Sequence, residues 1–133
     1  MRQVRLLIAV PILAGLALPA QAEGALAVAI HEKGLREGFA YAWHLRAATK
    51  EDARKEALAE CGLQAKMNGV NPLRCKVTEV FSKQCIAAAF DPQSRSAGWG
   101  VGRNEEAARI LAIKRCREKG TAACHISDLD CDK

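Results

Sequence analysis

Six cysteines are the residues of this chain whose type and spacing most clearly predict a chemistry. They are Cys61, Cys75, Cys85, Cys116, Cys124 and Cys131. None of them stands in the C-x-x-C spacing of redox motifs, and they lack the paired C-x-x-C of zinc ribbons. Six cysteines in a small exported domain are typical of three structural disulfides. We therefore expect disulfides rather than a metal centre or a reactive thiol.

Histidines and serines are the next candidates for chemistry. Nucleophilic catalysis needs a base within hydrogen-bond reach of a nucleophile and a third group that orients the base. The chain has three histidines, His31, His44 and His125, but no nucleophile elbow, phosphate loop or zincin helix. We expect no catalytic residue and no cofactor. A cleft that gathers His44 or His125 with an unpaired cysteine or a carboxylate pair would favour an enzyme instead.

An acidic cluster ends the chain, and it contains His125, Asp128, Asp130 and Asp132. On an extended strand the three aspartates would share one face, and carboxylates are ligands for a hard cation such as calcium. However, the segment lacks the glycine and the closing glutamate of a calcium loop, and a cysteine interrupts it. We expect a solvated acidic tail that meets the basic residues Arg115, Arg117 and Lys119, and no metal site.

The N-terminus is typical of a secretory signal peptide at residues 1–22. Arg2 and Arg5 precede an apolar run over residues 6–18, and small residues follow it up to Ala22. The run is too short to span a bilayer, which needs roughly 20 residues. We expect residues 23–133 to form one periplasmic or secreted domain without a transmembrane segment. Loss of the two arginines lowers the formal net charge from +5 to +3, a mild excess that does not indicate nucleic-acid binding.

The positions of the cysteines along the chain reveal an internal repeat. At an offset of 55, Cys61 aligns with Cys116, and alanines at 53 and 57 align with alanines at 108 and 112. With a gap in the preceding loop, Phe39 aligns with Trp99, and residues 27–30 align with 87–90. Downstream, Cys75 corresponds to Cys124 and Cys85 to Cys131. The repeats span about 25–85 and 86–131.

Each repeat has the pattern strand, strand, helix, strand. The predicted strands span residues 26–30, 39–43, 75–81, 86–90, 98–102 and 124–129, and the predicted helices span 50–61 and 105–117. Thr49 and Asn104 are the expected helix N-caps. The fold class is therefore α+β, a duplicated ββαβ unit with pseudo-twofold symmetry, an antiparallel sheet, two helices and three disulfides.

These motifs, in this order, resemble a family of small secreted bacterial domains of unknown function. The shared motifs are an Ala-rich strand, a strand in which glycines flank an aromatic residue, and an Ala-rich helix that ends in cysteine; the likeness covers about residues 25–131. The resemblance implies export and a disulfide-stabilised fold. It brings no catalytic residues to this chain.

The repeat also predicts the disulfide pairing. Cys61 ends a helix and Cys75 opens the next strand, so a short return brings them together, and the same argument pairs Cys116 with Cys124. Cys85 and Cys131 remain, and we expect their bond near the symmetry axis, where it would join the halves. The competing pattern links the two helices through Cys61 and Cys116.

Aromatic residues on the strands are the candidate binding residues. Phe39, Tyr41 and Trp43 alternate with alanines and share a face, and Trp99 is aligned with the first of them. If the helices cover the face of small residues, the aromatic face is free to bind a partner. The alternative, which burial energy favours, is that the aromatic residues form the core.

Three functions follow from these observations. The first is a non-enzymatic module that binds a protein or an envelope polymer, and an exposed aromatic patch would favour it. The second is a small periplasmic hydrolase. The third is a structural or stress-related envelope protein without a specific ligand.

Overall fold

The computed structural model describes residues 15, 22–119 and 123–132. The predicted signal peptide, residues 1–22, lies outside the described residues except for Gly15 and Ala22. The strands are β1 (Glu23–Ile30), β2 (Phe39–Ala47), β3 (Lys76–Ser82), β4 (Cys85–Asp91), β5 (Ser96–Gly102) and β6 (His125–Cys131). The helices are α1 (Lys50–Met67) and α2 (Glu105–Glu118), and short 3₁₀ turns lie at Leu35–Glu37 and Pro72–Arg74.

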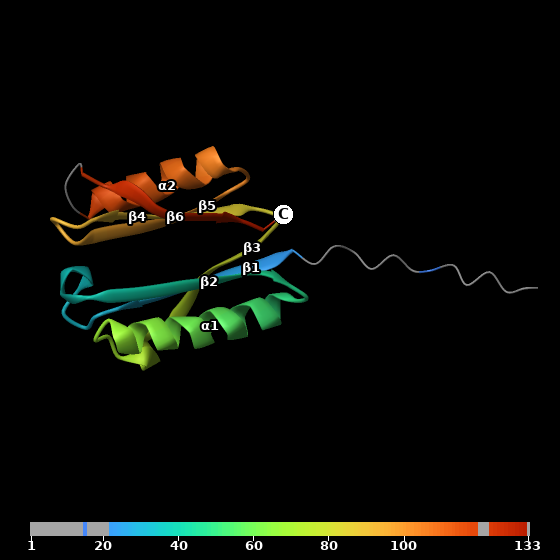
Figure 1. Ribbon diagram of the computed structural model, residues 1–133, viewed down its shortest axis with the longest axis horizontal. Helices are drawn as coiled ribbons and strands as arrows, with labels where there is room; N and C mark the ends of the chain where they lie inside the picture. The colour runs from blue at the N-terminus through green and yellow to red at the C-terminus, as the bar shows by residue number, and fades with distance from the viewer. Residues whose placement is uncertain (1–14, 16–21, 120–122, 133) are drawn as a thin grey trace, which may run out of the picture.

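The elements form four layers, in the order α1, sheet, sheet, α2 (Figure 1). Each sheet has three antiparallel strands, ordered β2-β1-β3 in one and β5-β4-β6 in the other. The succession strand, strand, helix, strand therefore occurs twice, and the predicted α+β class is confirmed. The one predicted antiparallel sheet is in fact two, because each unit closes its own three-stranded sheet and covers one side of it with its own helix.

Both helices begin at the predicted caps. Thr49 Oγ1 accepts a hydrogen bond from the Asp52 N–H at 3.0 Å, and Asn104 Oδ1 accepts from the Ala107 N–H at 2.8 Å. Helix α1 continues six residues beyond the predicted end at residue 61. Gly62 does not end it, because the next five residues are good helix formers and the chain first takes a positive φ at Gly69.

Small residues fill the space between each helix and its sheet. The buried face of α1 is formed by Ala53, Ala57, Cys61 and Ala65, and that of α2 by Ala108, Ala112 and Cys116. Helix α2 lies so close to β5 that a Cβ added at Gly98 would stand 2.3 Å from the Cys116 nitrogen. Alanine and glycine here allow close helix-on-sheet packing, and this explains why the chain has so many of them.

Large residues fill the space between the two sheets. This core contains Leu26, Val28, Phe81, Ile86 and Trp99, with Phe39, Tyr41 and Trp43 partly buried against it. Trp99 packs edge-on against Phe39 and Tyr41, with ring centroids 5.8 and 5.6 Å apart. Both faces of each sheet are therefore interior. The face of small residues packs against a helix and the aromatic face packs against the other sheet, so both belong to the core.

The strand pairings define which residues of the two units correspond. Leu26 pairs with Trp43 and with Glu79, and Ala88 pairs with Trp99 and with Asp128. The counterpart of Trp99 is therefore Trp43 and not Phe39. The sequence alignment of the first two strands was wrong by two and four residues, because Ala-rich strands give no distinct anchor for the register.

The disulfides are Cys61–Cys75, Cys116–Cys124 and Cys85–Cys131, the three predicted pairs, and no cysteine is free. The competing Cys61–Cys116 bond is absent from the described residues. The expected location of Cys85–Cys131 was wrong, since it joins neighbouring strands β4 and β6 within one sheet. By register, its counterparts in the first unit are Glu23 and Ser82, whose side chains form a hydrogen bond instead.

The acidic C-terminus is solvated only in part, because Asp128 is exposed whereas Asp132 is buried. Asp132 is fully buried and its Oδ1 accepts a hydrogen bond from the Arg46 N–H. Arg115 pairs with Glu79 of β3 rather than with these aspartates. The prediction extended the strand pattern to Asp132, whereas β6 ends at Cys131 and Asp132 follows it, so strand alternation does not decide where the Asp132 side chain lies. Neither described helix is long and apolar enough to cross a membrane.

Candidate functional site

Contacts between the sheets show how their edges align. At one edge, Tyr41 of β2 lies beside Ser127 of β6, and both line one small cavity. At the other, Arg115 Nη1 of α2 lies 3.4 Å from Glu79 Oε1 of β3 and donates to the Trp99 carbonyl of β5 at 2.8 Å. Strand β2 therefore lies over β6, and β3 lies over β5. Each edge carries a groove.

The first groove lies at the edge formed by β2, β6 and α1, and has a volume of about 490 Å³. It is lined by Phe39, Tyr41, Ala42, Trp43, Glu60, Leu63, Gln64, Asn68 and Asp128. The aromatic side chains come from β2, the polar ones mainly from α1, and one carboxylate from β6. A groove with aromatic walls and a few polar groups is the usual form of a binding site.

The predicted binding residues divide between this groove and the core. Phe39, Tyr41 and Trp43 line the first groove while their other sides pack between the sheets. Trp99 lies in the core, only 7% exposed. The structure thus brings the three aromatic residues of β2 together at one groove. Trp99 lies behind Phe39 and Tyr41, in contact with both rings.

Burial changes the chemistry of Tyr41. Loss of solvent raises the pKa of Tyr41 above its ordinary value of 10.0, the nearby Asp128 carboxylate raises it further, and the hydrogen bond to Ser127 acts in the opposite direction. The phenol is therefore neutral at physiological pH and serves as a polar wall of the groove.

The backbone of β2 is open on the groove side. The Phe39 carbonyl accepts a hydrogen bond from Asn68 Nδ2 at 3.0 Å, so it points away from β1. In an antiparallel pair this orientation repeats every second residue, so Tyr41 and Trp43 also direct their backbone groups away from β1. Among the described residues no hydrogen bond reaches these groups from outside the sheet.

The second groove, about 320 Å³, lies at the opposite edge. Its lining includes Glu79, Gly98, Trp99, Arg115, Glu118 and Lys119. By strand register and by the helix offset of 55, these positions correspond to Asp128, Ala42, Trp43, Glu60, Leu63 and Gln64 of the first groove. The two grooves are thus equivalent places with different side chains.

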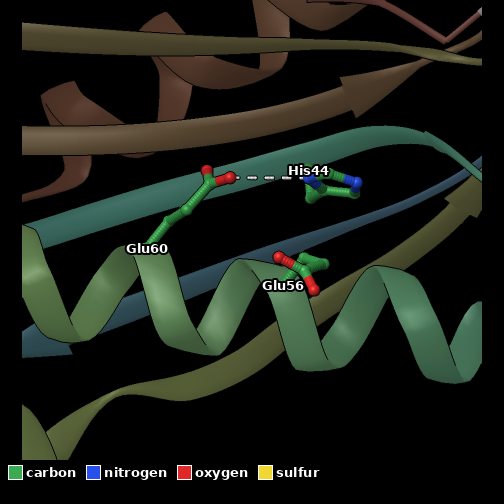
Figure 2. Close-up of side chains that lie close together, drawn as sticks. All are labelled: His44, Glu56 and Glu60. Carbon is green, nitrogen blue, oxygen red and sulfur yellow. Dashed lines mark ion pairs between the residues drawn. The ribbon is translucent and has the colours of Figure 1, made fainter.

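A histidine and two carboxylates meet beside the first groove (Figure 2). His44 of β2 lies on the α1 side of its sheet, and its Nδ1 stands 3.5 Å from Glu60 Oε1. Glu56, one helical turn earlier, completes a group whose ligand atoms all lie within 4.8 Å of one another. One nitrogen and two carboxylate oxygens at this spacing are a donor set that suits zinc or a similar ion.

A further hollow lies on the outer surface of α2 and β6, with a volume of about 740 Å³. Three isoleucines, Ile110, Ile113 and Ile126, form its apolar floor. Charged side chains of both signs surround them: Arg109, Lys114, Arg117 and Glu118. It is larger than either groove, but it is shallow and contains no aromatic residue. The first groove is the better candidate because two layers of the fold build it.

The sequence-family model for a domain of unknown function, DUF4189, matches residues 24–131. The chain belongs to the DUF4189 family. The match spans both ββαβ units, all six cysteines and both grooves of this DUF4189 domain. No curated protein and no solved structure is significantly similar to the chain.

Sequence reasoning missed the helical wall of the DUF4189 groove. Glu60, Leu63, Gln64 and Asn68 lie on the edge of α1 next to β2. Leu63 is 63% exposed, and an apolar residue off the alanine face of the helix was the available signal. His44 was named as a residue that a carboxylate pair could turn into a catalytic site, but its meeting with two glutamates depends on the strand register, which the sequence did not reveal.

Proposed function

We propose that the protein is an exported, non-enzymatic binding module that holds a partner in the first groove. Three disulfides fit a protein outside the cytoplasm, and the N-terminal signal supports a periplasmic or secreted location. The observation that carries the proposal is the lining of the groove, where Phe39, Tyr41 and Trp43 form an aromatic wall beside an open strand edge. An extended protein segment or an envelope polymer fits such a groove.

The strand edge strengthens this proposal. Tyr41 and Trp43 offer backbone donors and acceptors in the same groove as their side chains. A partner in extended conformation gains affinity from main-chain hydrogen bonds and specificity from the side-chain wall. Aromatic residues also supply much of the binding energy at protein interfaces.

Affinity capture from an envelope extract tests the proposal. Leu63→Ala truncates an exposed leucine of the groove. The matched control is Leu73→Ala, which truncates a leucine that is 90% exposed and lies outside the groove. Capture of a defined species should weaken with Leu63→Ala and with Trp43→Ala, and should be unchanged with Leu73→Ala. Thermal unfolding of each variant confirms that it is folded. Equal capture by all four proteins would remove the support for a binding groove.

A metal-dependent hydrolase is the second candidate, and the His44, Glu56 and Glu60 cluster favours it. This is the meeting of a histidine with a carboxylate pair that would indicate an enzyme. A zinc ion held by three protein ligands keeps an open position for water. Incubation with Zn²⁺ followed by assays on peptide, ester and glycan substrates tests it. The outcome that rejects it is no turnover beyond that of a Glu56→Gln variant.

A further inference from the structure

We propose that the first groove binds the guanidinium group of an arginine from a partner protein, at the place that Arg115 occupies in the second groove. The inference rests on the proposed binding function and specifies its ligand. It comes from comparing the two equivalent grooves, of which one contains its own arginine and the other does not.

Arg115 shows what an arginine does at this place. It leaves α2 at the helix position that corresponds to Glu60 of α1. Its Nη1 donates to the Trp99 carbonyl at the open edge of β5 and lies 3.4 Å from the Glu79 carboxylate. One guanidinium thus satisfies a strand-edge carbonyl and an acidic residue together, which its planar array of donors makes favourable.

The first groove has the same acceptors without the arginine. Trp43 corresponds to Trp99, and its carbonyl likewise points off the sheet edge. Asp128 corresponds to Glu79 and lines the groove. At the position of the arginine stands Glu60, so the groove contains two carboxylates, and among the described residues neither the Trp43 carbonyl nor Asp128 has an ion-pair or hydrogen-bond partner from α1.

Charge and shape then identify the guest. Two carboxylates at the mouth of a groove favour a cation, and the aromatic walls of Tyr41 and Trp43 favour one that stacks on a ring face. Guanidinium meets both conditions and reaches a carbonyl at the same time, whereas a lysine ammonium is a compact point charge. His44 holds Glu60 at 3.5 Å in the free protein. A bound cation would therefore compete with His44 for the Glu60 carboxylate. The residue at the position of His44 in the second unit is Gly100, so the second groove has no such competition.

The substitution Glu60→Arg gives the first groove the residue of the second. We expect the variant to fold, because Arg115 is already accommodated at the equivalent place, and to fill its own groove. Glu51→Arg is the matched control, since it makes the same charge change on α1 at a side chain that is 85% exposed and outside both the groove lining and the His44 cluster. Both variants keep the wild-type circular dichroism if they are folded.

Binding is measured with the acetylated tripeptide amide Val-Arg-Val, following the indole N–H resonances of the two tryptophans. The peptide should shift Trp43 saturably, and the analogue with citrulline, which is isosteric but neutral, should bind about tenfold or more weakly because charge-assisted hydrogen bonds are lost. Glu60→Arg should abolish binding and Glu51→Arg should retain it.

Three results overturn the inference: no saturable binding of the arginine peptide, equal binding of the citrulline peptide, or equal weakening by the two charge variants. These failures are separable from failure of the proposed function. If capture of an envelope species still depends on Leu63 and Trp43 while the arginine peptide does not bind, the groove binds a partner of another chemistry and only the arginine inference fails.

Discussion

The backbone N–H of Arg46 donates a 2.7 Å hydrogen bond to Oδ1 of Asp132, residues that are 86 positions apart in the chain. Arg46 lies near the end of β2 and Asp132 directly follows β6, so the bond ties the two sheets at the edge that bears the first groove. The Arg46 guanidinium adds a second link to the Cys131 carbonyl at 3.0 Å. This edge is therefore held by polar contacts in addition to the aromatic core.

Replacement of Asp132 by alanine should destabilise the fold. Asp132 is fully buried, and its loss leaves the Arg46 N–H without its acceptor, which costs about 1–3 kcal/mol. Asp132→Asn keeps an Oδ1 acceptor and should cost less. Urea unfolding of the two variants measures the difference. An Asn variant as unstable as the Ala variant would contradict this role for the hydrogen bond.

Gly98→Ala should be strongly destabilising although it adds only a methyl group. The new Cβ would stand 2.3 Å from the Cys116 backbone nitrogen, so α2 must move away from β5. Overpacking of this kind costs typically about 1–3 kcal/mol. Gly62→Ala is the matched control, since the nearest atom to its Cβ is 3.9 Å away and alanine favours a helix by about 1 kcal/mol. Thermal melts should therefore shift in opposite directions.

The elements of this fold could be predicted because their local signals are strong. Thr49 and Asn104 cap helices whose alanines recur on one face, and both caps and both helix starts are where the sequence placed them. The pairs Cys61–Cys75 and Cys116–Cys124 followed from the short return between each helix and the next strand, and Cys85–Cys131 was the pair that remained. Short-range physics decides the caps and the helices, and each of these is visible in a window of a few residues.

The candidate site could be predicted only in part, because it depends on contacts between distant segments. The alternation at Phe39, Tyr41 and Trp43 indicated a shared face, but not that this face is covered by a second sheet. The meeting of Tyr41 with Asp128 requires the register of β2, β4 and β6 together. Since alanine-rich strands fit one another in several registers, the correspondence of Trp43 with Trp99 emerged only from the structure.

The three disulfides should differ in their contribution to stability according to loop length. Their sequence separations are 46 for Cys85–Cys131, 14 for Cys61–Cys75 and 8 for Cys116–Cys124. The chain-entropy relation gives about 4, 3 and 2.5 kcal/mol. Double Cys→Ala variants, compared by denaturant unfolding, should follow this order.

The loss of Cys85–Cys131 should nevertheless leave the two sheets packed. The bond lies within one sheet, and in the first unit a hydrogen bond between Glu23 and Ser82 takes its place. A double Cys→Ala variant at 85 and 131 should therefore keep the near-ultraviolet circular dichroism of Trp99 and Tyr41 under native conditions. Loss of that signal with the helices intact would show instead that this disulfide holds the halves together.

Tyr41 should titrate above the ordinary tyrosine pKa of 10.0, and it can be followed alone because it is the sole tyrosine in the chain. Burial is the main cause of the raised pKa, so the folded protein holds the phenol proton more tightly than the unfolded chain does. Stability from this source is complete below the pKa of the unfolded tyrosine and is lost as pH rises through that of the folded one. The Tyr41→Phe variant should lose less stability over this alkaline range than the wild type.

Two neighbours of Tyr41 should move its pKa in opposite directions. Asp128→Asn removes a negative charge that raises the pKa, so the titration midpoint should fall. Ser127→Ala removes a hydrogen bond that lowers the pKa, so the midpoint should rise. Tyrosinate absorbance measures each midpoint, and Asp130→Asn is the control, because it removes the same charge from β6 at a residue that is not among the causes of the Tyr41 shift. Shifts of the same sign in the Asp128 and Ser127 variants would mean that β6 does not face Tyr41, and the first groove would lose its outer wall.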